Sequence, residues 1–289
     1  MTGAPLGHPH HYARWLGGAH ARVRAGLARL HPWLAEFLIF GFKQAWAALF
    51  GGVMLALLIV TKLVWQPDWW LARYDFLTLT ALAVQAILLA TKLESWREAR
   101  VILLFHVVGT GMELFKTHVG SWSYPEPSLL RIGGVPLFSG FMYAAVGSYI
   151  ARVTRIFDLR YVHAPPNAWV LALGLAIYVN FFTHHYLPDI RPALFLCAAL
   201  IWRRTRIIFT VDVAPRWMPL LLAAALTAFF IWIAENVGTA TGAWLYPTQR
   251  VWHMVSFGKF GAWFLLIVLS FALVSLVHPP RPPDRTERP

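Results

Sequence analysis

Charged residues are scarce in this chain of 289 residues: Asp, Glu, Lys and Arg make up 13%, hydrophobic residues make up 58%, and the mean hydropathy is +0.55. A water-soluble domain carries about a quarter of charged residues. So few polar side chains cannot cover a globule of this size in water, which excludes an ordinary soluble enzyme and a disordered chain. The composition therefore indicates a protein embedded in a membrane.

Cysteine and acidic residues are also rare. The single cysteine, Cys197, excludes an internal disulfide and a zinc site built from cysteines. The 13 acidic residues are outnumbered by 25 Lys and Arg, which gives a net charge of +12. The sequence lacks the motifs G-x-x-x-x-G-K, G-x-G-x-x-G and G-x-S-x-G, so nucleotide-binding and acyl-serine chemistry have no support.

Long apolar stretches follow one another along most of the chain. A helix that crosses a membrane needs about 20 mostly apolar residues. Eight candidate spans approach or exceed this length: 34–60, 70–90, 101–119, 135–153, 168–183, 191–209, 217–237 and 255–277. The sixth is the weakest, because three arginines shorten its apolar run, so a tilted span, a re-entrant hairpin or a seven-span arrangement stays open. The expected fold class is all-α, a polytopic membrane protein with about eight transmembrane helices.

The placement of basic residues favours eight spans with both termini in the cytoplasm. In that topology 17 of the 25 Lys and Arg fall in cytoplasmic segments, as the positive-inside rule requires, so the net charge sets orientation and we expect no nucleic-acid partner. We expect the bacterial inner membrane as the location. Residues 1–33 form a basic, His-rich cytoplasmic segment, residues 34–277 the membrane domain, and residues 278–289 a disordered tail.

One motif of thirteen residues occurs twice. Residues 113–125 read ELFKTHVGSWSYP and residues 235–247 read ENVGTATGAWLYP, with six identical positions and no gap. The copies are separated by an even number of spans, so both point the same way across the membrane. This predicts a parallel four-plus-four repeat over about 34–153 and 168–277, with both motifs near the non-cytoplasmic side.

The repeated acids, Glu113 and Glu235, are the leading candidates for catalytic residues. A carboxylate inside a span costs about 2.5–3.5 kcal/mol, and intramembrane ionisable groups are functional by default. The alternative is structural pairing, for instance with Lys116, His118 or Lys259. The Gly, Trp, Tyr and Pro that follow each acid are explained equally well as a helix stop and an interfacial anchor.

A third polar cluster, N-F-F-T-H-H-Y-L-P-D-I-R over residues 180–191, faces the same side in this topology. His184 is a candidate acid–base group because histidine titrates near neutrality, and Asp189 is a candidate beside it. A divalent metal held by His184, His185 and Asp189 is a weaker alternative, because adjacent helical side chains point about 100° apart. No cofactor is predicted. Asn180 is more often a helix-packing residue than a reactant.

Further polar and aromatic side chains are expected to line a substrate site. They are Trp122, Tyr124, Trp244, Tyr246, His106, His118, Asn180 and Lys259. The aromatic rings of the two motifs can shield a carbocation through cation–π contact. His106 lies two helical turns before Glu113, on the same face of the expected helix.

Several segments resemble the YoaT-like family of bacterial integral membrane proteins. They are residues 112–126, 134–143, 147–149, 180–185 and 232–236, within a match from about Phe42 to Ser275. The resemblance implies a bacterial multi-span membrane protein and supplies no function, since that family is a domain of unknown function.

A more distant resemblance concerns the order Glu, Thr, Gly, aromatic-x-Tyr, then Gly134-Val135-Pro136. It is similar to membrane carotenoid hydratases and intramembrane lycopene cyclases, which protonate or hydrate isoprenoid double bonds with buried carboxylates. This sequence has Gly-Ser-Trp-Ser-Tyr where the hydratase pattern has a second Gly before the Tyr. The likeness is an analogy of motif and fold.

Two functions follow from these patterns. In the first, the chain is an intramembrane enzyme, and Glu113 and Glu235 act as proton donor and charge stabiliser on a lipid-soluble, isoprenoid-like substrate. In the second, it is a proton-coupled transporter or permease, since secondary carriers use repeated bundles with interior polar sites. The expected partners are the lipid bilayer and a lipid-soluble small molecule. Carboxylates in a closed apolar pocket would favour chemistry, and a polar cavity open to one side would favour transport.

Overall fold

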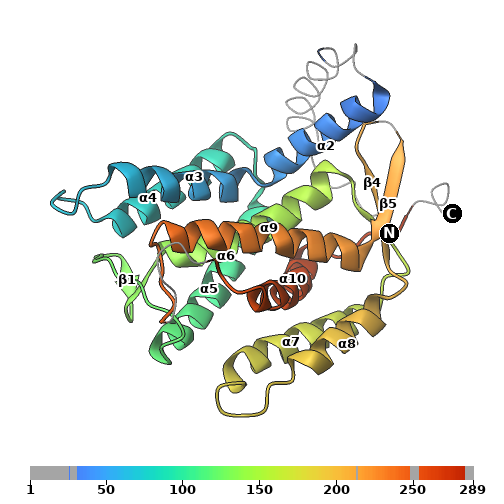
Figure 1. The fold of residues 1–289 in the computed structure, drawn as a ribbon. Helices are drawn as coiled ribbons and strands as arrows, with labels where there is room; N and C mark the ends of the chain where they lie inside the picture. Colours follow the sequence, from blue (N-terminus) through green and yellow to red (C-terminus); the bar gives the residue numbers. More distant parts are fainter. Residues whose placement is uncertain (1–25, 27–30, 213, 248–253, 284–289) are drawn as a thin grey trace, which may run out of the picture.

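The computed structural model describes residue 26 and residues 31–212, 214–247 and 254–283, and over these the chain is mostly helical (Figure 1). The helices are α2 (Pro32–Ala47), α3 (Leu49–Val64), α4 (Arg73–Ala90), α5 (Trp96–His118), α6 (Phe138–Ile156), α7 (Asn167–Thr183), α8 (Arg191–Trp202), α9 (Leu220–Ala240) and α10 (Gly258–Val277). Most of the expected N-terminal segment 1–33, and residues 284–289 of the expected tail, lie outside the described residues.

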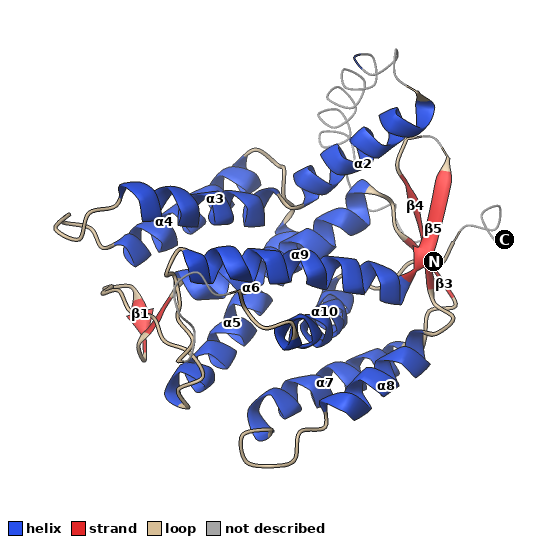
Figure 2. Cartoon of the chain, viewed as in Figure 1, coloured by secondary structure: helices blue, strands red, loops and turns tan. Residues whose placement is uncertain are grey.

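Short strands make the all-α expectation wrong in detail. Within the described ranges, β1 (Arg131–Ile132) and β2 (Val135–Pro136) form a hairpin. The strands β3 (Arg160–Val162), β4 (Arg206–Thr210) and β5 (Pro215–Pro219) form an antiparallel sheet in that order. Figure 2 shows the two sheets at opposite ends of the helices. The starts of the expected spans 135–153 and 217–237 therefore lie in strands and not in helices.

Helices able to cross a membrane are present. Among the described residues, α4, α9 and α10 are long and apolar enough to do so. The helices α2 and α3 pass the same test together but bend by 74° at the break between them, so the first expected span is broken. The bend falls at Ala48, without a proline or glycine at that position. The chain is a membrane protein, and its described part has three such helices, or four if the bent pair is one span.

The sixth expected span, 191–209, is wrong over residues 203–209. Helix α8 has 12 residues and ends at Trp202, and the residues of β4 pair with β5 instead. Twelve residues at about 1.5 Å each reach only about 18 Å, well short of the roughly 30 Å of a hydrocarbon core. The cause is the group of arginines after Trp202, which cannot continue an apolar helix into lipid, whereas the Ile-Ile-Phe-Thr run that follows favours a strand.

A buried ionic group joins α6 to the segment between α4 and α5. Arg152 is fully buried, and its Nη1 lies 3.5 Å from Oε1 of Glu94. Its Nη2 donates to the carbonyl of Trp46 at 2.8 Å. Glu94 also accepts hydrogen bonds from Ser148 Oγ (2.8 Å) and Gln85 Nε2 (2.6 Å). Both charges are thus removed from water and depend on each other.

The two copies of the repeated motif end their helices in the same way. Gly120 and Gly242 have φ values of +72° and +68°, a conformation that glycine adopts without strain. In each copy, the N–H after the glycine donates to the carbonyl five residues earlier, at 2.8 Å from Ser121 and 3.0 Å from Ala243. This is the glycine-terminated helix end that the motif predicts.

Replacing either glycine by alanine should lower the free energy of unfolding by about 1–2 kcal/mol, because a Cβ disfavours the left-handed conformation. Gly52→Ala is the matched control, since Gly52 lies inside α3 and a Cβ there meets nothing within 4 Å. Thermal unfolding in detergent micelles measures all three variants. Equal melting temperatures for Gly120→Ala, Gly242→Ala and the control would contradict the expectation.

Candidate functional site

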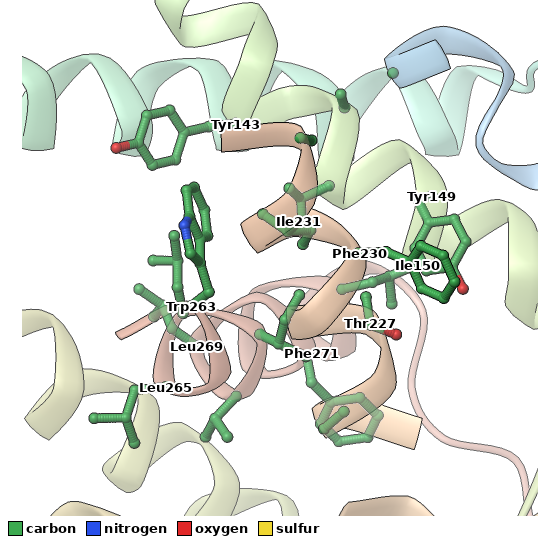
Figure 3. A pocket seen from close by; sticks show the side chains of 18 of the residues that line it. Tyr143, Tyr149, Ile150, Thr227, Phe230, Ile231, Trp263, Leu265, Leu269 and Phe271 are labelled. Carbon is green, nitrogen blue, oxygen red and sulfur yellow. The ribbon is translucent and has the colours of Figure 1, made fainter. Parts of the chain in front are cut away.

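A large cavity lies among α5, α6, α7, α9 and α10, with a volume of about 1130 Å³ and a mostly apolar lining. Figure 3 shows Tyr143 and Trp263 near each other on one side of this pocket and Tyr149 and Thr227 on another. Both repeated acids line the cavity, with exposed fractions of 4% for Glu113 and 5% for Glu235. Two carboxyl groups, 122 residues apart in sequence, therefore line the same cavity.

Glu113 is held by three neutral donors. Its Oε2 accepts hydrogen bonds from Trp122 Nε1 at 2.6 Å and from the hydroxyl of Tyr124 at 2.7 Å. Its Oε1 accepts one from the hydroxyl of Tyr143 at 2.8 Å. Trp122 and Tyr124 belong to the motif that follows α5, whereas Tyr143 comes from α6. The carboxyl group is fixed in position without a basic partner in these hydrogen bonds.

Glu235 repeats this arrangement with its own copy of the motif. The hydroxyl of Tyr246 donates to its Oε1, and Tyr246 is eleven residues after Glu235, as Tyr124 is after Glu113. The indoles of Trp244 and Trp263 lie near this carboxyl group and act on it. Each acid therefore accepts a hydrogen bond from the Tyr eleven residues after it, and Glu113 also accepts one from Trp122, so these aromatics do more than anchor the chain at the interface.

The two motif copies meet directly. Ser123 and Leu245, which occupy the same position in the two copies, exchange a pair of backbone hydrogen bonds of 2.9 Å each. Beside this bridge, the Trp122 ring lies edge-on to the Tyr246 ring, with centroids 6.0 Å apart. The contact brings the aromatic partners of both acids into one cluster.

Basic groups line the same cavity close to the acids. Lys116 Nζ lies 3.2 Å from His184 Nε2 and 2.6 Å from His185 Nε2. Lys259 Nζ lies 4.1 Å from the ring centroid of Tyr246. Lys116, Lys259 and His184 are all cavity-lining residues. The structure thus brings the polar cluster after α7 to the two glutamates through Lys116.

A family model described as "Protein of unknown function (DUF817)" matches residues 36–271. The chain belongs to the DUF817 family. It is 42% identical over 243 residues to the "Uncharacterized protein YoaT" of Bacillus subtilis (strain 168), a match that covers 84% of this chain and 91% of that protein. The resemblance to the YoaT-like family is confirmed, and the more distant resemblance to carotenoid hydratases and lycopene cyclases stays a prediction.

The DUF817 chain is also similar to two solved structures of MvINS, a mycobacterial Insig homolog from Mycobacterium vanbaalenii, one of which is a cross-linked trimer. Each has a TM-score of 0.47 and 16% identity, and the match covers 66% of this chain and 98% of the other.

Asp189 is a candidate that the structure places at the rim and not among the cavity-lining residues. It is exposed, and its Oδ2 accepts a hydrogen bond from Arg191 Nε at 2.6 Å. The Arg191 guanidinium holds the pKa of this carboxyl well below its usual range. Asn180 is buried, lines the cavity and donates to Asp189 at 3.3 Å. Asp189 therefore lies outside the lining of the cavity, where it pairs with Arg191 and Asn180, and its catalytic role in this DUF817 chain stays a prediction.

Two expected lining residues, His106 and His118, lie elsewhere. The ring of His106 packs against Phe141 of α6 with centroids 4.6 Å apart, and His118 is exposed at the end of α5. Neither is among the lining residues of the cavity. His106 and Glu113 do share a helix face, but that face packs against α6 at His106 and borders the cavity at Glu113.

The metal alternative gains no geometric support. Over the described part of the chain, no three His, Cys, Asp or Glu side chains are placed to hold a metal ion. The rings of His184 and His185 are 4.3 Å apart, but both face the ammonium group of Lys116. Asp189 pairs with Arg191 instead of joining them.

The sequence pattern does not identify Tyr143 of α6, which donates to Glu113, or Trp263 of α10, which lies near Glu235. Both lie in apolar helices outside the repeated motif. A signal was present, since the polar atom of a buried Tyr or Trp needs a hydrogen-bond partner. It gives no indication of which carboxyl group the partner is.

Lowering the pH should destabilise the contact between His185 and Lys116. Burial and the Lys116 charge lower the pKa of His185, so the unfolded chain binds its proton more readily. The stabilising contribution is then full above the unfolded pKa of about 6.5 and is lost as the pH falls through the folded value. The melting temperature in micelles should fall between about pH 7.5 and pH 5.5, and fall less for His185→Gln. An identical pH dependence for both proteins would contradict this.

Proposed function

We propose that this chain is an intramembrane enzyme that transfers a proton between the carboxyl groups of Glu113 and Glu235 and a lipid-soluble substrate in the cavity. One observation carries the proposal: both buried carboxyl groups line a single, mostly apolar cavity of about 1130 Å³. A cavity with such walls suits an apolar molecule, whereas a water-soluble cargo would need a more polar lining.

The chemistry is general acid–base catalysis. A carboxyl group removed from water favours its proton-bearing form, and it can give this proton to one carbon of a double bond. A C–H bond forms and the adjacent carbon becomes a cation, which the second carboxylate and the faces of the aromatic cluster stabilise. The cation then either loses a proton from a neighbouring carbon to a carboxylate, which isomerises the substrate, or binds the oxygen of water, whose proton returns to a carboxylate.

We further propose that α3–α6 and α7–α10 are two parallel repeats, in the bacterial inner membrane with both termini in the cytoplasm. The contacts between the two halves support this assignment. In the proposed repeat, α7 corresponds to α3 and α9 corresponds to α5. The contact of α3 with α9 has its counterpart in the contact of α7 with α5. The bridge between Ser123 and Leu245 lies where a pseudo-twofold axis would pass. The short α8 would then reach only part of the way across the bilayer.

Proton-coupled transport is the second candidate, favoured by the acids at the junction of the two halves. Proteoliposomes loaded with a pH-sensitive dye separate the candidates. Proton flux that depends on an added solute and is lost in Glu113→Gln and Glu235→Gln would favour transport, whereas absence of such flux favours chemistry.

The proposed enzyme is tested by comparing lipid extracts of bacterial cells with and without the wild-type gene by chromatography and mass spectrometry. We expect a lipid that differs between the two extracts by the mass of water, or an isomer that separates at equal mass. Identical extracts would argue against the proposal.

A further inference from the structure

The charged groups of the cavity are gathered in one region. Lys259 Nζ lies 4.1 Å from the Tyr246 ring and 5.6 Å from the Trp122 ring, beside the hydrogen-bond partners of both acids. Arg191 also lines the cavity, and its charge acts on Lys116 and on Lys259. The lining contributed by α2, by the rest of α6 and by α9 is mainly aliphatic and aromatic. The cavity therefore has one basic region and a long apolar remainder.

The two lysines are not neutralised by ion pairs. Among the residues that the structure describes, no carboxylate forms a salt bridge with Lys116 or Lys259. Lys116 Nζ instead contacts two histidine nitrogens and lies 4.4 Å from the ring centroid of Phe181. The acids, in turn, are bound by neutral Tyr and Trp donors. Charges of both signs share the cavity without pairing.

The absence of salt bridges to the two lysines in the described part of the chain determines the net charge of the site during the proposed reaction. If the donor acid carries its proton, a single carboxylate remains beside the two ammonium groups of Lys116 and Lys259, so the site keeps a net positive charge. A buried charge without a partner is unfavourable, and an anion bound next to both ammonium groups would remove the penalty. An ammonium group is a compact point charge that binds phosphate and carboxylate alike.

We propose that the ligand of this cavity is an amphipathic anion, with a phosphate or carboxylate bound by Lys116 and Lys259 and a long apolar chain along the walls of α6, α9 and α10. The inference rests on the proposed function, because it takes one of the two acids to be protonated as the proton donor. A volume of about 1130 Å³ exceeds the roughly 300–1,000 Å³ of pockets for drug-sized molecules, so a long chain fits.

Native mass spectrometry of the purified full chain, released from detergent, tests this with four probes: hexadecyl phosphate, hexadecanoate, hexadecan-1-ol and inorganic phosphate. We expect at least one of the two anionic amphiphiles to bind about tenfold or more tightly than the alcohol of the same chain length, and inorganic phosphate to bind more weakly than either. Equal binding of the alcohol and both anionic probes would overturn the proposal. Inorganic phosphate bound as tightly as hexadecyl phosphate would identify a free-anion site and overturn it too.

Variants locate the site. Lys116→Gln and Lys259→Gln should each lower the affinity for the anionic probe about tenfold without changing the binding of hexadecan-1-ol. Lys259→Arg should retain most of the affinity for the anionic probe. Lys62→Gln, which removes an exposed lysine outside the cavity, is the matched control and should change nothing. Unchanged affinity in both Lys116→Gln and Lys259→Gln would overturn the assignment, and the wild-type comparison of probes holds even if a variant fails to fold.

The outcomes separate this site from the proposed enzyme. Glu113→Gln should keep the anionic probe bound, since the change adds no positive charge and removes no lysine. If the wild-type chain prefers the anionic probe but lipid extracts from cells with and without the gene are identical, the binding site is supported and the enzyme is rejected. Altered lipid extracts with no preference for the anion would reject the site and leave the enzyme.

Discussion

Replacing Glu113 by glutamine is expected to lower the rate of lipid conversion by about 10²–10⁴-fold, the usual contribution of a positioned general acid. The amide keeps the volume of the side chain and an oxygen that accepts the bonds of Trp122 and Tyr124. It cannot supply the proton. The amount of product in lipid extracts, set against the amount of folded protein in the membrane, measures the effect.

Two comparisons make this result specific. Glu36→Gln changes the same chemical group at a surface pair with Arg216, outside the cavity, and should leave conversion unchanged. Tyr143→Phe removes one of the three donors to Glu113 and should lower the rate by less than Glu113→Gln does. Full conversion by Glu113→Gln at normal protein abundance would show that this carboxyl group is not the proton donor.

Replacing Arg152 by methionine should cost about 3–5 kcal/mol of unfolding free energy, because it leaves the carboxylate of Glu94 buried without its partner. Arg152 and Glu94 have fully buried side chains with 3.5 Å between the charged atoms. Thermal unfolding in micelles should show a lower melting temperature, and the protein should be less abundant in membranes.

The double change Arg152→Met with Glu94→Gln should recover part of this loss, since it removes both charges together. Arg100→Met, at an exposed position of α5, should change stability by no more than about 0.5 kcal/mol. If Arg152→Met were as stable as Arg100→Met, the buried ion pair would contribute nothing to the fold.

The repeated motif predicted much of the candidate site because its information is local. The glycine that ends each helix and the Trp and Tyr that follow lie within twelve residues of Glu113 or Glu235, so a chain reversal returns them to the acid. The apolar composition likewise predicted the membrane helices. The contacts to each acid depend on residues near it in sequence, and the membrane helices depend on their apolar composition. Both features can therefore be inferred from the sequence.

Other parts of the site depend on packing between distant helices. The position of Tyr143 beside Glu113 follows from how α6 lies against α5, and the same packing directs His106 away from the cavity. The 74° bend near Ala48 has no proline or glycine at the break. Strand β4 forms because β3 and β5 are available to pair with it. The sequence does not show the partner in any of these contacts, although the Ile-Ile-Phe-Thr run by itself favours a strand at β4.

Deuterium transfer from heavy water to carbon tests the proposed proton transfer most directly. Purified protein is incubated in D₂O micelles with lipid extract from cells that lack the gene, and lipids are then washed in H₂O and analysed by mass spectrometry. With the wild-type chain we expect a lipid with deuterium at a carbon position that does not exchange with water, and with Glu113→Gln we expect none. Wild-type protein that introduces no deuterium into any lipid, or Glu113→Gln that introduces as much, would contradict proton donation by this carboxyl group.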